Sequence, residues 1–148
     1  MKNTVKALFG SCLMILLSGC AVTNLTSDID PDANLESLRS IYVVRQPNDR
    51  RGIEEMIALE LRKYGKDAFH GDNAEPPANV DAILTYVDKW MWDITNYLLD
   101  LRIELRHPET GYILATGNSY RTSLARKSPE GMVKEVIGET FGIQNRQE

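Results

Sequence analysis

The sequence contains few cysteines, and both lie near its N-terminus. Of the 148 residues, only Cys12 and Cys20 carry a thiol, so the rest of the chain has no disulfide framework. Hydrophobic residues make up 43% of the chain and charged residues 26%, which is ordinary for a globular protein and argues against wholesale disorder. The length suits one domain and a leader, and we expect packing alone to stabilise that domain.

An excess of positive charge is also missing. The formal net charge is −4, and removal of a leader that contains Lys2 and Lys6 but no acid would leave the remainder more acidic still. Proteins that bind nucleic acids usually carry a basic stripe or patch. We therefore expect no nucleic-acid partner.

The motifs of metal and catalytic sites are absent as well. His70 and His107 stand alone, and the sequence has no HExxH or CxxC motif. Ser119, Ser123 and Ser128 lack the context of a nucleophile elbow. No glycine-rich stretch matches a phosphate-binding loop. We therefore expect no metal, no cofactor other than a covalent lipid, and no enzymatic activity.

The sequence lacks a hydrophobic run of the roughly 20 residues that a transmembrane helix needs. Its apolar run covers only residues 7–17 and follows a short cationic stretch, residues 1–6. The small residues Ser18 and Gly19 come next. This order is typical of an export signal peptide, and we predict that residues 1–19 are cleaved.

Residues 17–20, Leu-Ser-Gly-Cys, resemble the lipobox of bacterial lipoproteins. In that family the cysteine sulfur receives a diacylglyceryl group, the leader is cut before the cysteine, and the new amino group is acylated. The resemblance implies that Cys20 is the lipidation site, and acyl chains in this number anchor a protein stably. By resemblance to Gram-negative lipoprotein sorting, Ala21 implies the periplasmic face of the outer membrane.

The segment after this cysteine is polar. Residues 21–37, "AVTNLTSDIDPDANLES", contain four acids and no apolar periodicity. This composition is typical of a linker. We predict a lipidated tether at 20–37, which would reach up to about 60 Å at roughly 3.5 Å per residue.

Residues 38–148 are predicted to form one α+β domain. Runs of β-branched and aromatic residues indicate strands, and apolar spacings of 3 and 4 indicate helices. The expected strands are 40–46, 66–70, 80–94, 96–107 and 112–123, and the expected helices are 50–63 and 128–141. The order β-α-β-β-β-β-α predicts a two-layer sandwich, a mainly antiparallel sheet with two amphipathic helices on one face.

Several local signals place the ends of these elements. Asp49 is the expected N-cap of the first helix, and Ser128 that of the second. Residues 108–111, Pro-Glu-Thr-Gly, are typical of a hairpin turn. In strand 96–107, apolar and mostly charged residues alternate. This predicts Leu101 and the other odd-numbered residues from 97 to 105 on the buried face, and Leu98 on the opposite face.

The segment "VDAILTYVDKWMWDITNYLLDLRIELRHPETGYILATG" resembles the central part of a group of small, functionally uncharacterised Gram-negative outer-membrane lipoproteins. Its most distinctive part is Trp-x-Trp-Asp at 90–93, and the resemblance covers about residues 40–142. More loosely, the architecture is similar to the periplasmic lipoprotein fold of auxiliary transport subunits and of the lipopolysaccharide-assembly lipoprotein. Neither resemblance brings catalytic residues.

Four aromatic residues form the first candidate site. Tyr86, Trp90, Trp92 and Tyr97 are concentrated in two neighbouring predicted strands, and aromatic groups often mark interfaces and ligand grooves. They would form a partner- or ligand-binding face. The alternative is that Trp90 and Trp92 cover the sheet beneath a helix or form a surface ladder.

Charged residues give two further candidates. Asp88, Asp93 and Asp100 could act as paired carboxylates, but their spacing matches no calcium loop. Their alternation with basic residues instead favours a solvated sheet face with cross-strand charge pairs. A basic rim could bind an anionic headgroup or cell-wall polymer, or serve only solubility. Its residues are Arg50, Arg51, Arg126 and Lys127.

Two functions of different classes fit these features. The first is a non-enzymatic accessory or binding subunit of an envelope complex, anchored by lipid on the periplasmic side of the outer membrane. The second is a periplasmic lipoprotein that binds a small ligand or lipid between sheet and helices, beside Trp90 and Trp92. Edge strands of such a sandwich can also pair between chains, which would give a homodimer.

Overall fold

The structure, a computed structural model, describes residues 22–72 and 76–142. The predicted signal peptide, residues 1–19, and the predicted lipidation site, Cys20, lie outside the described residues. Strands and helices follow the order β1 (Thr23–Ile29), β2 (Ser40–Val44), α2 (Ile53–Lys63), β3 (Asp67–Gly71), β4 (Ala82–Asp93), β5 (Thr95–Arg106), β6 (Ile113–Arg121), the 3-10 helix η1 (Ser123–Ala125) and α3 (Pro129–Gly142).

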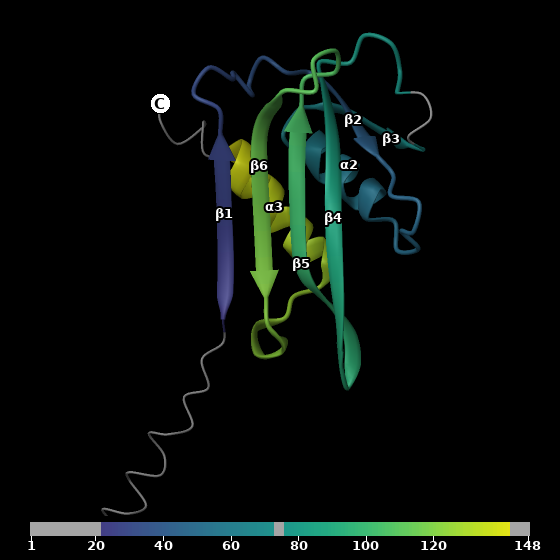
Figure 1. Ribbon diagram of the computed structural model, residues 1–148, viewed down its shortest axis with the longest axis vertical. Helices are drawn as coiled ribbons and strands as arrows, with labels where there is room; N and C mark the ends of the chain where they lie inside the picture. The colour runs from purple at the N-terminus through teal and green to yellow at the C-terminus, as the bar shows by residue number, and fades with distance from the viewer. Residues whose placement is uncertain (1–21, 73–75, 143–148) are drawn as a thin grey trace, which may run out of the picture.

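The six strands form one sheet in the order β1-β6-β5-β4-β2-β3. The pairs β1–β6, β6–β5 and β5–β4 are antiparallel, while β2 runs parallel to both β4 and β3. Helices α2 and α3 lie side by side behind this sheet (Figure 1). The predicted α+β class with both helices on one face is therefore confirmed. The sheet is mixed, with three antiparallel and two parallel strand pairs.

The core lies between the sheet and the two helices. Ile53, Ile57 and Leu61 recur on one face of α2 and are fully buried, as their spacing of four residues predicts. The buried face of α3 is formed by Met132, Val133, Val136, Ile137, Thr140 and Phe141. Within the described ranges, neither helix is long and apolar enough to cross a membrane.

Helix α3 approaches β6 most closely at Gly117. A Cβ atom there would lie 2.5 Å from Thr140 Oγ1 and 2.8 Å from Val136 Cγ2, closer than real Cβ contacts. Only glycine allows this approach without a shift of the helix. Before the start of β6, Gly111 adopts a φ of 69° and closes the β5–β6 hairpin, as predicted for residues 108–111.

A bulge interrupts the β4–β5 ladder. Lys89 pairs with Asp100 but Trp90 pairs with Leu98, so Leu99 is an extra residue in β5. The bulge reverses the alternation, and Leu98 becomes fully buried. The predicted exposed position of Leu98 is therefore wrong, because strict alternation cannot continue through an inserted residue.

The segment predicted to be a flexible tether is largely part of the fold. Residues 23–29 form β1, which pairs with β6 from Thr23 opposite Arg121 to Ile29 opposite Ala115. Three residues of β1 face the helices, and the last of them, half-buried Ile29, packs against the core. The middle one is Ser27, a polar residue, so the sequence does not show the alternation of apolar and polar residues that would indicate a strand. An edge strand needs only one partner and one covered face, so a polar sequence suffices.

The chain then crosses the upper end of the sheet to β2 (Figure 1). Leu35 is 1% exposed and belongs to the core. The Lys66 ammonium donates to the carbonyl oxygens of Leu35 at 2.7 Å and Leu38 at 2.8 Å. Burial lowers the pKa of Lys66. Residues 23–37 of the expected tether 20–37 therefore belong to the folded domain.

Replacement of Leu35 tests whether this segment belongs to the fold. Leu35→Ala leaves a cavity in the core, and we expect the free energy of unfolding to fall by about 2–4 kcal/mol. Urea denaturation measures it. Glu36→Ala, at the exposed neighbouring position, is the control and should change the value by less than about 0.5 kcal/mol. Equal values for both variants would restore the linker interpretation.

Candidate functional site at the β4–β5 hairpin

The predicted aromatic and basic residues meet at the β4–β5 hairpin. The Arg51 guanidinium carbon lies 3.7 Å from the centroid of the Trp90 ring, and the Arg126 carbon lies 5.1 Å from the centroid of the Tyr97 ring. Trp90 and Tyr97 occupy neighbouring rungs of the hairpin. Side chains on neighbouring rungs of a ladder point to opposite faces, so the two predicted sets meet at this hairpin as two separate ring–guanidinium pairs.

Trp90 belongs partly to the core. It is half-buried and packs against the core cluster, and its Nε1–H donates to Asp88 Oδ2 at 2.6 Å. Arg51 lies over the ring, and such cation–π contacts contribute about 0.5–1 kcal/mol at exposed sites. For Trp90, the interpretation as a residue that covers the sheet is therefore the better one.

Trp92 has a different environment. Its side chain is 72% exposed, and Ile94 at the hairpin turn is 83% exposed. Ile94 has a φ of 61°, a left-handed conformation that costs a β-branched residue about 1–2 kcal/mol. Glycine or asparagine would relieve this strain. The hairpin therefore ends in a strained, exposed aliphatic residue beside an exposed indole.

Arg126 connects the loop after β6 to the hairpin. Its guanidinium donates to Thr95 Oγ1 at 2.9 Å and lies 3.7 Å from Asp93 Oδ2. Lys127 instead forms an ion pair with Glu135 of α3, and Arg50 is exposed. The predicted basic rim is thus divided, and two of its four members engage the hairpin.

The remaining two aromatic candidates are buried, and Tyr97 is 9% exposed. Tyr86 is 2% exposed, and its hydroxyl donates to Asp49 Oδ2 at 2.7 Å, with Glu54 Oε2 at 3.3 Å. Asp49 also accepts the backbone N–H groups of Arg51 at 2.6 Å and Ile53 at 2.7 Å. The predicted N-cap position of Asp49 is therefore wrong, because α2 begins at Ile53 with Gly52 as its N-cap, but the Asp49 carboxylate still accepts a backbone N–H at the start of the helix.

The surroundings in this buried cluster shift the pKa values of Asp49 and Glu54 in opposite directions. Burial alone would raise the pKa of Asp49, but hydrogen bonds from Arg51, Tyr86 and Ile53 hold that pKa below its usual value. Burial, reinforced by the neighbouring Asp49, raises the pKa of Glu54. Burial also raises the pKa of Tyr86. Sequence reasoning placed Asp49 at the start of the helix but missed Glu54, because its burial depends on a strand distant in sequence.

The other acidic candidates lie apart from one another. Asp88 accepts from Trp90, Asp93 pairs with Arg126, and the Asp100 carboxylate lies 3.5 Å from Lys89 Nζ. The predicted cross-strand charge pair is confirmed for Lys89 and Asp100, which are directly opposite. Within residues 22–72 and 76–142, the structure shows no group of three or more metal-ligating side chains.

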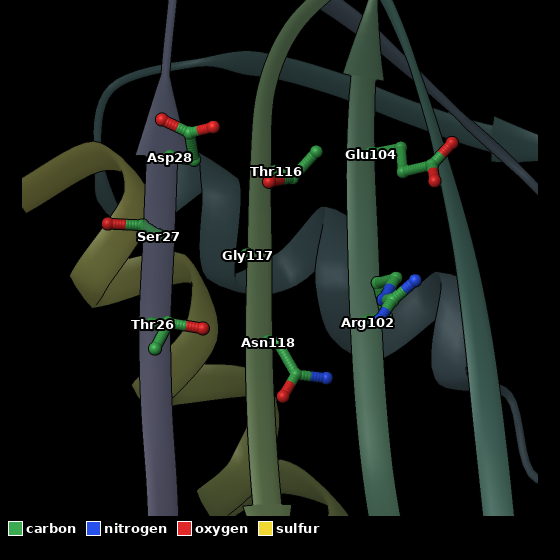
Figure 2. A pocket seen from close by; sticks show the side chains of 8 residues that line it. All are labelled: Thr26, Ser27, Asp28, Arg102, Glu104, Thr116, Gly117 and Asn118. Atoms are coloured by element: carbon green, nitrogen blue, oxygen red, sulfur yellow. The ribbon is translucent and has the colours of Figure 1, made fainter.

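The uncovered face of the sheet carries a shallow polar depression of about 200 Å³. Side chains from β1, β6 and β5 project into it on the side away from the helices (Figure 2). Its lining residues are Thr26, Ser27, Asp28, Arg102, Glu104, Thr116, Gly117 and Asn118. Glu104 pairs with Arg106, as expected of a solvated sheet face.

No family model and no curated protein matches this chain. Among solved structures, it is similar to the dodecamer of a singly substituted PelC from Paraburkholderia phytofirmans, with 16% identity and a TM-score of 0.60 over 80% of this chain and 96% of that one. A second PelC dodecamer from the same organism gives 15% identity and a TM-score of 0.60 over 80% and 98%. At such identities the likeness shows a shared fold.

A minor lipoprotein from Acinetobacter baumannii is also similar, with 15% identity over 74% of this chain and 90% of that one. Its TM-score is 0.31, which is too low to show a common fold.

Neutral replacements distinguish the two buried carboxyl groups. The Asp49 pKa is lowered in the folded protein, so its contribution is present above the ordinary carboxyl pKa and is lost as pH falls through the folded value. At pH 7, Asp49→Asn should therefore lower the free energy of unfolding by about 1–2 kcal/mol. The difference from the unsubstituted protein should shrink below about pH 4.

Glu54→Gln is the matched variant. The folded Glu54 pKa is raised, so its favourable contribution is complete below the ordinary carboxyl pKa and is lost as pH rises through the folded value. Glu54→Gln should therefore not lower the free energy of unfolding at pH 7. Urea titrations between pH 3 and pH 8 measure both variants, and an equal loss at pH 7 would refute the assignment.

The two tryptophans should differ in fluorescence. In Trp92→Phe, Trp90 is the remaining indole, and we expect weak quenching by acrylamide because the core and Arg51 cover it. Adding Arg51→Ala should increase that quenching, whereas Arg50→Ala at the neighbouring exposed position should not. If Arg51→Ala leaves the Stern–Volmer slope unchanged, Arg51 does not cover the ring.

Proposed function

We propose that this protein is a non-enzymatic accessory subunit of an envelope complex, held on the periplasmic face of the outer membrane by a lipid on Cys20. The lipobox resemblance supports the anchor. The structure adds a geometric argument for how the anchored domain is held.

The position of β1 is the observation that carries this proposal. Thr23 is only three residues after Cys20 and already pairs with Arg121 of β6. Three residues reach at most about 10 Å. A lipid on Cys20 would therefore hold the folded domain directly against the bilayer, which suits a subunit that acts at the membrane surface.

The environments of the candidate catalytic groups support a binding role. Asp88, Asp93 and Asp100 each have a structural partner and lie apart. The buried pair Asp49 and Glu54 contacts Tyr86 and the start of α2. Carboxyl groups engaged in this way stabilise the fold, and the two that lie close together, Asp49 and Glu54, are buried in it.

The two edges of the sheet suit association with another chain. β1 and β3 are the terminal strands, and an edge strand presents unpaired backbone groups that can extend a sheet. The PelC structures that share this fold are dodecamers. We include self-association through these edges in the proposal, in place of the simple homodimer.

The alternative, a pocket for a small ligand between sheet and helices, has less support. Leu84, Leu98 and Leu101 of the sheet are fully buried, and Met132 and Ile137 of α3 pack in the same cluster. Trp90 is covered by Arg51. A ligand beside Trp90 would have to displace well-packed side chains.

Cys20→Ser tests the anchor. Because the thiol is the acceptor of the lipid, we expect complete loss of radioactive palmitate from the protein and its release from the outer-membrane fraction. Cys12→Ser, within the predicted leader, is the control and should change neither property. A palmitate-free protein that stays with the membrane, or unchanged labelling of Cys20→Ser, would contradict the proposal.

Crosslinking in living cells tests the accessory role. We expect a defined protein adduct, either with another envelope protein or with further copies of this chain, at constant stoichiometry. Native mass spectrometry of the purified protein provides the opposing outcome. A retained small molecule in a protein without crosslinked partners would favour the ligand-binding alternative.

A further inference from the structure

Exposed apolar side chains gather at one end of the domain. Among the described residues, the three most exposed large apolar ones are Ile94 at 83%, Leu124 at 73% and Trp92 at 72%, and Val22 is 51% exposed. They come from three segments distant in sequence, namely the start of β1, the β4–β5 turn and the loop after β6. All three segments lie at the lower end of the sheet in Figure 1.

Hydrogen bonds hold these three segments together. The N–H and the hydroxyl of Thr122 both donate to the Val22 carbonyl oxygen at 3.2 Å. Four residues later, Arg126 donates to Thr95 Oγ1 at 2.9 Å. The loop that carries Leu124 is thus fixed to β1 on one side and to the hairpin on the other. We call this surface of Val22, Trp92, Ile94 and Leu124 the apolar end.

We propose that the apolar end inserts into the headgroup region of the lipid bilayer that holds the anchor. This inference rests on the proposed function, because it takes Cys20 to be lipidated. Cys20 is two residues before Val22, so the two are at most about 7 Å apart. The lipid is therefore attached at the same end of the domain as the exposed apolar side chains.

The chemistry of the apolar end suits a membrane interface. Indole rings favour the region between headgroups and acyl chains, where one edge is apolar and the other hydrated. Aliphatic side chains at this depth add affinity in proportion to the area they bury. The Asp93 carboxylate at the turn is paired with Arg126, which reduces the repulsion from anionic lipids.

The strain at Ile94 supports the same inference. An exposed β-branched residue at a φ of 61° gains nothing from the fold that glycine or asparagine would not supply. Residues held in unfavourable backbone conformations concentrate at functional positions. Contact with a bilayer accounts for an aliphatic side chain at this turn.

Trp92 provides the test, because the chain has only two tryptophans. Full-length lipidated Trp90→Phe is reconstituted in vesicles of phosphatidylethanolamine and phosphatidylglycerol with brominated acyl chains. We expect Trp92 fluorescence to fall about twofold relative to unbrominated vesicles, with protection from aqueous iodide. In the matched variant Trp92→Phe, the remaining Trp90 should show no such loss.

Ile94→Asn is a second test, because it removes an exposed aliphatic side chain without straining the turn. Asparagine tolerates the left-handed conformation, so the thermal midpoint should rise, whereas Trp92 quenching by bromolipid in the Trp90→Phe background should weaken. Ile113→Asn, an exposed apolar position at the opposite end of β6, should not weaken it.

The outcomes separate this inference from the proposed function. If Trp90→Phe carries palmitate and stays with the vesicles while Trp92 is open to iodide and insensitive to bromolipid, the membrane contact is refuted and the anchor stands. If iodide is excluded without bromolipid quenching, a protein or a second copy covers the apolar end, which also refutes the inference. Loss of palmitate refutes the proposed function itself.

Discussion

The antiparallel pairing of β1 with β6 determines how the rest of the molecule is oriented. Seven consecutive residue pairs, from Thr23 opposite Arg121 to Ile29 opposite Ala115, place the N-terminal end of β1 at the end of β6. A domain on a long flexible linker could adopt many orientations at a membrane. If Cys20 carries the lipid, as proposed, an edge strand that begins three residues later leaves the domain few orientations, with Val22 and the β4–β5 turn at the end nearest the lipid.

The β4–β5 hairpin combines two structural roles along its length. Near the sheet, Trp90 packs against the core beneath Arg51 and Leu98 is buried by the bulge. Beyond the bulge, Trp92 and Ile94 lie largely in solvent. The rung of Trp90 and Leu98, the first one beyond the bulge, thus still stabilises the fold, and only the rungs nearer the turn project from it. Arg126 braces that end against the loop after β6, so its exposed residues are held in place.

Much of the fold could be predicted from local sequence. The spacing of Ile53, Ile57 and Leu61 gave α2, and Ser128 gave the start of α3, where its hydroxyl accepts the Gly131 N–H at 3.1 Å. Features that depend on distant partners could not be found in this way. β1 is recognisable only once β6 is beside it, because Ser27 interrupts its pattern.

The candidate site shows the same limit. Tyr86, Trp90, Trp92 and Tyr97 were found as one aromatic group, but sequence could not separate the buried Tyr86 and Tyr97 from the half-buried Trp90 and the exposed Trp92. These environments depend on residues distant in sequence, such as Arg51 over Trp90, and the bulge in β5 also has no signature in the sequence. Ile94 offered the one local signal that was overlooked, an isoleucine where a tight turn favours glycine or asparagine.

Amide hydrogen exchange of the full-length lipidated protein in vesicles tests the central claim, which is that residues 23–29 are a strand held against the membrane and not a tether. The account predicts slow exchange across these residues, comparable with that of β6. Exchange as fast as in an unstructured peptide would mean that the domain floats free of its anchor, and would contradict the account.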